Sequence, residues 1–385
     1  MPEKMDLKIK PLTPIFTGGL EGKCDRLRET GIIGSMRWWF EAIVRGMGGH
    51  ACDPSMHTCK DGQYCDACKI FGSTGLKRVF RLNVLESGFD KDGDELQIRV
   101  VKDYQKVTAN GLKPFNHNGW FLKPGVANDD LKIHMYFPVR SISKSELTAT
   151  EIGQLLLLPL KVMSDWGGLA AKNQQGYGVF DLSDEASFDI DKSIEALKKL
   201  LGKHKDNNMQ VNVPRIDQFF FSRIEFQIEE KSIKEFWNKR IYLPKQKNEE
   251  MLRGDDSFLP LAPLVRYYLR SLIREQEGWN RDLRHLLMGE VQGNNRKKSL
   301  INCSHAYLKN DKTYEMRIWG WIPKTRQRTR EEILTKLDNW TQSSGLLWDD
   351  THCNLNVVKR DWKQRGTDET IEDYLRNLVG VGVNK

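Results

Sequence analysis

An arginine followed by two aromatic residues occurs twice in the chain, and this repeat constrains the fold more than any other feature. One copy starts at Arg37 and the other at Arg266, and each has a second arginine eight residues later. After each copy, an apolar residue stands directly before a glycine. A basic cluster follows, and then a predicted strand in which apolar and polar residues alternate. Two amphipathic helices can resemble each other by chance, but a duplicated unit accounts for more of this shared order. The sequence therefore predicts a duplicated domain with an insertion in its first copy.

The length of the chain agrees with two domains, because 385 residues exceed what one simple core usually organises. The polar stretch 202–217 has linker composition, so we predict an N-terminal domain at 1–205 and a C-terminal domain at 206–385. The first domain shows a strand, a helix from about Gly34 to Met47, strands near 78–86, 96–107 and 131–139, a helix starting near Thr148 or Thr150, and a strand. This order is typical of a ferredoxin-like α+β unit.

The net charge of +8 favours a polyanionic partner, although 60 basic and 52 acidic residues make the excess small. The longest apolar run, LLLLPL at 155–160, is far shorter than the roughly 20 residues that span a bilayer. The first residues lack an apolar signal core, so we expect a cytoplasmic protein without a membrane segment.

Four of the seven cysteines, Cys52, Cys59, Cys65 and Cys68, lie close together in the insertion at 50–70. Such a cluster in a cytosolic protein indicates a metal rather than disulfides. The spacing of Cys65 and Cys68 lets two thiolates bind one zinc ion, while His50 or His57 could replace one of the other two ligands. We expect structural zinc, since a closed four-ligand site leaves no position for a catalytic water; free thiols in a loop are the alternative.

The helix after the first strand has an apolar stripe of Met36, Phe40, Ile43 and Met47. Arg37, Glu41 and Arg45 follow at intervals of four on another face, where a solvated ion-pair ladder is the simplest interpretation. The second copy has Arg266, Arg270 and Arg274 with no acid between them. Three like charges would repel one another, so we expect an anion there. Gly34 and Ser35 at the predicted helix start would offer backbone N–H groups and a hydroxyl to phosphate.

The segment GGLAAKNQQGYG at 167–178 runs from a helix to a strand, with Lys172 and Tyr177 inside it. Glycines allow close approach to phosphate, lysine supplies charge, and tyrosine can stack on a base, although plain glycine-rich connectors are common. Walker, G-x-S-x-G and H-E-x-x-H motifs do not occur in the sequence. His117 is the one candidate for a general base in metal-independent RNA cleavage.

The motifs LTPIFTGG, RETGIIGSMRWWF and CDACKIFGSTG, together with the GG…K…GYG loop, resemble the RAMP superfamily of CRISPR proteins. Within it, they are most similar to the family of first subunits of the Cmr (type III-B) effector complex. The resemblance covers residues 11–180 and implies two tandem ferredoxin-like (RRM-like) domains. It also implies a non-catalytic role near the 3′ end of guide RNA, because target cleavage in this family belongs to other subunits. The segment C-x-x-C-x-x-F-G favours zinc.

We therefore expect an RNA-binding subunit that contacts guide RNA, target RNA and other RAMP subunits, and that recognises the RNA backbone more than its sequence. A metal-independent endoribonuclease and a purely architectural subunit remain alternatives. The predicted RNA-binding residues are glycines, helix-start groups and cations: Gly18, Gly19, Ser35, Arg37, Arg45, Lys77, Arg78, Arg81, Lys172, Tyr177, Arg266, Arg296 and Lys297. The predicted metal ligands are Cys52, Cys59, Cys65 and Cys68.

Overall fold

The computed structural model of the chain describes residues 3–19, 22, 24, 26–53, 59–60, 62–85, 96–98, 105–108, 111–114, 120–122, 131–138, 146–182, 188–201, 213–231, 241–242, 258–292, 295–323, 328–344 and 355–380. Its helices are α1 (Glu29–Gly46), α2 (Asp66–Phe71), α4 (Ala149–Trp166), α5 (Ile190–Leu200), α8 (Ala262–Glu275), α9 (Arg281–Met288), α10 (Arg330–Trp340) and α12 (Ile371–Val379), with 3-10 turns η1 (Asn173–Gln175) and η2 (Ile216–Gln218).

The first half forms a four-stranded antiparallel sheet in the order β2-β7-β1-β8, which we call the N-terminal sheet. Its strands are β1 (Glu3–Pro11), β2 (Arg81–Val84), β7 (Leu131–Phe137) and β8 (Phe180–Leu182). Helix α1 connects β1 to the β2 edge, and α4 connects β7 to β8. This βαββαβ order with the first and third strands in the centre is the ferredoxin-like topology that the sequence predicted.

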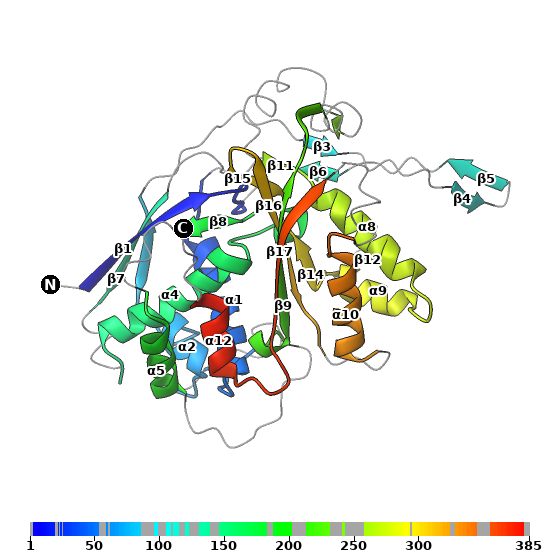
Figure 1. The fold of residues 1–385 in the computed structure, drawn as a ribbon. Coiled ribbons are helices and arrows are strands. Elements are labelled where there is room, and N and C mark those ends of the chain that lie inside the picture. The colour runs from blue at the N-terminus through cyan, green and yellow to red at the C-terminus, as the bar shows by residue number, and fades with distance from the viewer. Residues whose placement is uncertain are drawn as a thin grey trace.

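The second half repeats this topology around the C-terminal sheet, in the order β11-β15-β16-β9-β17 with β14 paired to β16. Its strands are β9 (Phe219–Gln227), β11 (Phe258–Leu259), β14 (Ile301–Cys303), β15 (Ala306–Asn310), β16 (Thr313–Trp321) and β17 (Asn356–Gln364). Strand β9 corresponds to β1, α8 to α1, β16 to β7 and α10 to α4 (Figure 1). Shorter strands form three small groups: β10 (Ile241–Tyr242) with β3 (Leu96–Ile98) and β6 (Trp120–Leu122), β12 (Glu290–Gln292) with β13 (Asn295–Lys297), and β4 (Gln105–Thr108) with β5 (Gly111–Pro114).

The two halves share their hydrophobic packing. On β9, Phe219 and Phe221 belong to the core of the first half, whereas Phe220 and Phe226 belong to the core of the second half. Alternate side chains of a strand point to opposite faces, so the C-terminal sheet lies between its own helices and those of the first half. The two halves therefore share one continuous interface. The boundary predicted at residue 205 lies outside the described residues and stays a prediction.

The last helix, α12, returns to the first half, where Figure 1 shows it beside α4 and α5. Tyr374, Leu375 and Leu378 are buried in the core of the N-terminal half. The indole Nε1 of Trp166, at the end of α4, donates a hydrogen bond of 2.6 Å to the carbonyl of Leu378. The first core is thus completed by residues from the far end of the sequence.

Helix α4 begins where the sequence indicated. Thr148 is its N-cap, and a capping box joins the Thr148 side chain and Glu151. Helix α1 begins at Glu29, five residues before the predicted start at Gly34, so that prediction was wrong. Glu29 in the first turn favours this earlier start, since acidic groups stabilise helix N-termini. Gly31 allows the close approach of Thr17, whose Cγ2 lies 2.7 Å from where a Cβ of residue 31 would be.

Candidate metal centre and nucleic-acid interface

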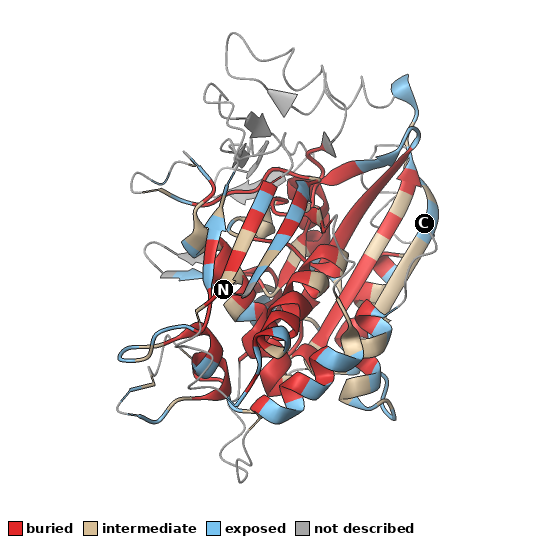
Figure 2. Ribbon diagram, turned by 90° about the vertical axis from the view of Figure 1, so that its left-hand side faces the viewer, coloured by how far each residue is buried: buried red, intermediate tan, exposed pale blue. Residues whose placement is uncertain are grey.

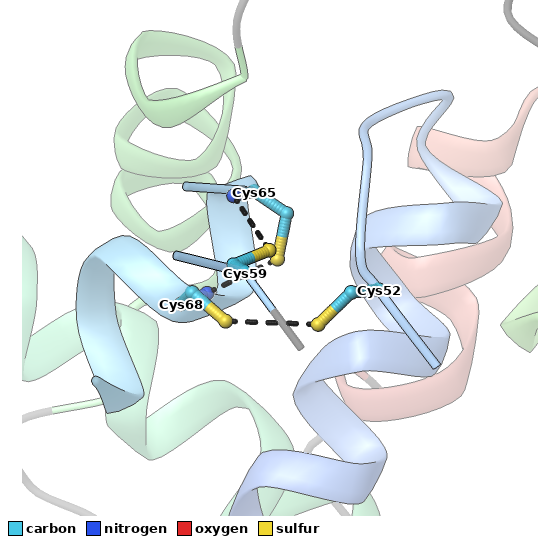
Figure 3. A group of neighbouring side chains, drawn as sticks. All are labelled: Cys52, Cys59, Cys65 and Cys68. Carbon is cyan, nitrogen blue, oxygen red and sulfur yellow. Dashed lines mark hydrogen bonds between the residues drawn. The ribbon is translucent and has the colours of Figure 1, made fainter. Parts of the chain in front are cut away.

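The four cysteines of the insertion come together in the structure (Figure 3). The Sγ atoms of Cys52, Cys59, Cys65 and Cys68 all lie within 4.8 Å of one another, and Cys52, Cys65 and Cys68 are buried. Cys65 caps the short helix α2, and its sulfur accepts the backbone N–H of Cys68 at 3.4 Å. The sulfur of Cys59 accepts the backbone N–H of Cys65 at 3.5 Å. The cluster that the spacing predicted is therefore confirmed.

The geometry of this cluster fits a zinc ion. Tetrahedral zinc with Zn–S bonds of about 2.3 Å places its sulfurs about 3.8 Å apart. Cys52 Sγ and Cys68 Sγ are 3.7 Å apart, whereas a disulfide would require about 2 Å. The hydrogen bond from Cys52 lowers the pKa of the Cys65 thiol, and hydrogen bonding to Cys65 raises the pKa of Cys52. Four sulfurs so close together compete for protons, which a divalent cation would replace.

Neither predicted substitute ligand takes part in the described cluster. His57 lies outside the described residues. The side chain of His50 is exposed and stays out of the cluster, while its backbone is fixed by Asp66. The His50 N–H donates to Asp66 Oδ2 at 3.0 Å, and the His50 carbonyl accepts the Asp66 N–H at 2.9 Å.

Arg37 points at the cysteine cluster. Its Nη2 donates to Cys68 Sγ at 3.1 Å and lies 3.9 Å from Cys52 Sγ, while Nη1 donates to the Gly72 carbonyl at 2.8 Å. Its Nε pairs with Glu41 Oε1 at 2.8 Å. Every side of the guanidinium therefore has a protein partner. The structure gives Arg37 a place beside the sulfurs, in contrast to the phosphate contact we expected for it.

Arg45 is buried as well, with 6 % of its surface exposed. It pairs with Glu41 at 3.5 Å and donates to the carbonyls of Ala51, Cys52 and Pro214. Burial lowers the pKa of Arg45, and Glu41 opposes this effect. The ion-pair ladder that we considered for this face is present, but it lies inside the protein, where it holds the cysteine loop against α1. Arg45 is therefore not available to RNA in this structure.

The arginines of the second copy also contact protein groups. Arg266 is buried and donates to the carbonyl of Ile301 at 2.6 Å and that of Met288 at 3.3 Å. Arg270 donates to the carbonyl of Gly289 at 3.0 Å, and Arg274 pairs with Glu275. The partial negative charge of the C=O groups compensates the buried guanidinium of Arg266 without an anion, and the carboxylate of Glu275 serves Arg274.

The two copies use equivalent contacts. Gly72 ends α2 and Gly289 ends α9, with φ of 81° and 77° and the same ψ of 167°. In each half an arginine of the central helix donates to the carbonyl of that glycine, Arg37 in the first half and Arg270 in the second. The contact in the second half thus comes one helical turn later than the Arg37–Arg266 correspondence predicted.

Ser35 does not form a phosphate site at a helix start, because it lies within the second turn of α1. Its Oγ accepts the backbone N–H of Ala170 at 2.8 Å and so fixes the glycine-rich loop. Gly167 packs on Trp39, whose Cζ2 lies 2.6 Å from where a Cβ of residue 167 would be. The loop is held between the two halves, since Gln174 donates to the Ser299 carbonyl and Gly176 accepts from the His305 N–H.

Within this loop the two predicted RNA contacts have different environments. Tyr177 is buried, edge-on to the His305 ring at a centroid distance of 5.5 Å, so its ring is not available for base stacking. Lys172 is partly exposed, and its Nζ lies 3.7 Å from the centre of the Phe16 ring. Gly18, two residues after Phe16, is exposed, and Gly19 is partly exposed. Lys172, Gly18 and Gly19 thus remain together at one accessible place.

The remaining predicted cations are on the surface. Lys77, Arg78 and Arg81 are exposed at the entry to and start of β2, and Arg296 and Lys297 are exposed on β13. Lys297 Nζ lies 3.6 Å from Glu290. His117, the candidate general base, lies outside the described residues. The sequence reasoning missed the solvent face of the N-terminal sheet, although the alternation of lysine and apolar residues in β1 was a signal for it.

No helix in the described part of the chain combines the length and the apolar character needed to cross a membrane.

Comparisons with known proteins connect this arrangement to a family. A chain in a cryo-EM structure of type III-B Cmr-beta bound to cognate target RNA and AMPPnP is 12% identical, with a TM-score of 0.38, over 98% of this chain and 99% of that one. Cmr1 from Pyrococcus furiosus in its apo form is 14% identical, with a TM-score of 0.35, over 85% of this chain and 92% of that one.

A search among curated proteins found no match. The model of the RAMP superfamily, in contrast, matches residues 8–181, which contain most of the N-terminal sheet, the cysteine cluster and the glycine-rich loop. The motifs that indicated this family lie within the same range, and the strand order of the N-terminal sheet is the one they implied. Residues 8–181 of the chain thus match the model of the RAMP superfamily.

Proposed function

We propose that this chain is a non-catalytic, RNA-binding subunit of a type III-B CRISPR ribonucleoprotein that acts in the cytoplasm. It contacts the backbone of guide or target RNA and assembles with other RAMP subunits. The observation that supports this most is the match of residues 8–181 to the RAMP superfamily over a ferredoxin-like half whose basic residues remain exposed. The solved structures that resemble it include type III-B Cmr-beta bound to target RNA.

The proposed contact surface contains the exposed members of the predicted set. At the glycine-rich loop these are Gly18, Gly19 and Lys172, and at the sheet edge Lys77, Arg78 and Arg81. Cations and exposed backbone bind phosphate without reading bases, so we expect affinity to fall steeply with salt and to depend little on sequence.

The test is RNA binding by a folded Lys172→Ala/Arg81→Ala double variant, with Lys312→Ala, an exposed lysine in the turn between β15 and β16, as the control. We expect weaker binding and a shallower salt dependence in the double variant only. Unchanged RNA affinity would show that Lys172 and Arg81 do not belong to the RNA-contacting surface. Cleavage of a repeat-containing RNA without metal would favour the endoribonuclease instead, and assembly with partner subunits without any RNA affinity would favour an architectural role.

We also propose that the cysteine cluster holds one structural zinc ion through Cys52, Cys59, Cys65 and Cys68. A bound zinc would neutralise the thiolates and fix the loop between α1 and α2, a role in folding rather than in catalysis. Metal analysis of the purified chain should give about one equivalent of zinc. Less than about half an equivalent in protein purified without chelators would contradict the site.

A further inference from the structure

The two sheets share one topology but differ in what covers their second face. In the C-terminal sheet this face is buried against the first half. Phe219, Phe221 and Trp319 belong to the first core, and Arg317 donates to the Ser164 carbonyl at the end of α4 at 2.6 Å. A nucleic acid cannot reach the centre of a sheet face that is packed in this way.

The N-terminal sheet instead presents this face to solvent. Along β1, Lys4, Asp6, Lys8 and Lys10 are exposed, whereas Leu7 and Ile9 are buried in the core. Figure 2 shows this alternation as blue bands across the strands beside the N-terminus. We call this surface, which carries Lys4, Lys8, Lys10, Arg81, Lys132 and Tyr136, the open face.

The register of the strands places an aromatic ring between cations on the open face. Tyr136 of β7 is paired with Lys4 of β1 on one side and with Arg81 of β2 on the other. In the next row of the same face, His134 lies between Asp6 and Asn83, and its Nδ1 is hydrogen-bonded to Asp6. The rings of His134 and Tyr136 have centroids 6.2 Å apart. Cross-strand neighbours on one face lie close enough to contact one ligand.

The charge of the open face identifies the kind of occupant. Among its described residues, Lys4, Lys8, Lys10, Arg81 and Lys132 are cationic, while Asp6 and Asp181 are acidic. An excess of cations around a partly exposed aromatic ring matches a polyanion that carries flat aromatic groups. Single-stranded RNA has both properties, because its bases can stack on a ring while its phosphates pair with lysine and arginine.

We propose that the open face of the N-terminal sheet is a binding platform for single-stranded RNA, with Tyr136 as the base-stacking residue and Lys4 and Arg81 as its phosphate partners. The proposal rests on the proposed function and makes it more specific. It assigns the platform to one half only, because the corresponding face of the other half is buried in the interface between them. The open face also adds new residues to the RNA-binding set predicted from the sequence, because Arg81 is the one residue that the two sets share.

The experiment uses the full chain and a fluorescently labelled single-stranded oligouridine, with affinity measured by anisotropy. Tyr136→Ala should weaken binding about tenfold, because stacking contributes about 1–3 kcal/mol per base in alanine substitutions. Tyr136→Phe keeps the ring and should bind like the wild type. Lys4→Ala/Arg81→Ala should reduce the slope of log affinity against log salt by about 1.4, as expected for two lost phosphate contacts. Lys312→Ala, on the other half, should change neither quantity.

The outcomes separate this proposal from the one it rests on. If the wild type binds the oligonucleotide and Tyr136→Ala binds equally well, the platform is wrong and the RNA-binding function stands. If the wild type binds no RNA, both are wrong. If Tyr136→Ala keeps its RNA affinity but no longer assembles with partner subunits, the open face is a protein interface and the proposal is overturned. Circular dichroism and zinc content equal to those of the wild type establish that each variant is folded.

Discussion

The side chain of Arg37 contacts the cysteine cluster, whereas the sequence led us to expect a contact with phosphate. Its spacing with Glu41 and Arg45 is visible in the sequence, and the ion pairs exist. The sequence does not show that the cysteine loop folds back onto α1 and places Cys68 Sγ 3.1 Å from the guanidinium. The clustering of the four cysteines was predictable because thiols at this spacing have one common use. The approach of Arg37 to their sulfurs was not, because it depends on a contact across 31 residues of chain.

Replacing Arg37 should weaken zinc binding. N–H groups that point at thiolate sulfur stabilise its negative charge, and partners of metal ligands typically contribute about 10–100-fold in metal affinity. We expect Arg37→Ala to lose zinc to a chelator faster than the wild type, measured with a colorimetric zinc indicator, and Arg37→Lys to lie between them. Arg81→Ala removes the same charge from an exposed position and is the control. Equal zinc release in all four proteins would show that Arg37 does not support the site.

At the scale of single elements, the start of α1 was the main error. The pattern of apolar residues locates the middle of a helix well. In α1, however, Gly31 and Gly34 led us to predict a start that was too late, because glycine is disfavoured inside helices. The structure shows two different reasons for the two glycines. A Cβ at residue 31 would lie 2.7 Å from Thr17 Cγ2, while a Cβ at residue 34 would meet no heavy atom within 4 Å.

These environments predict opposite effects of the same substitution. Gly34→Ala should increase the free energy of unfolding by about 0.5–1 kcal/mol, because alanine loses less backbone entropy in a helix. Gly31→Ala should decrease it, because Thr17 must move and Thr17 Oγ1 accepts the Arg28 N–H at 3.0 Å. Urea unfolding followed by circular dichroism measures both. Destabilisation by Gly34→Ala would indicate that the helix starts after residue 34, as the sequence suggested.

At the scale of the whole molecule, the ferredoxin-like order of both halves followed from the sequence, since hydrophobic periodicity and the repeat determine it. The way in which the halves pack together could not be predicted from the sequence. It depends on side chains such as Arg317, Phe221 and His305, which contact residues far away in the sequence. A strand that is buried on both faces does not itself show which partner covers which face.

His305 makes this joint sensitive to acid. Complete burial against the glycine-rich loop lowers the pKa of His305 to about 3. The unfolded chain, with a pKa near 6.5, binds the proton that the folded state excludes, so stability is fully present above about pH 6.5 and is lost as the pH falls toward 3. This one group should remove about 2 kcal/mol of unfolding free energy between pH 7 and pH 5.

His305→Gln removes the titration, and urea unfolding at the two pH values measures it. Both proteins share any acid-induced loss of zinc, so the difference between their pH dependences reports residue 305 alone. The variant should lose less stability than the wild type on acidification, even if it is less stable at pH 7. Equal losses of unfolding free energy in the two proteins would show that the folded state does not exclude a proton at His305.

The return of α12 to the first half also has a consequence for synthesis. A ribosome delivers the N-terminal sheet, the cysteine cluster and α4 long before Tyr374, Leu375 and Leu378, which complete their core. Until then the nascent first half exposes the apolar surface that α12 will cover, and domains usually fold in order of emergence. The first half should therefore complete its packing only after α12 has been synthesised, and chaperones should recognise its exposed apolar surface until then.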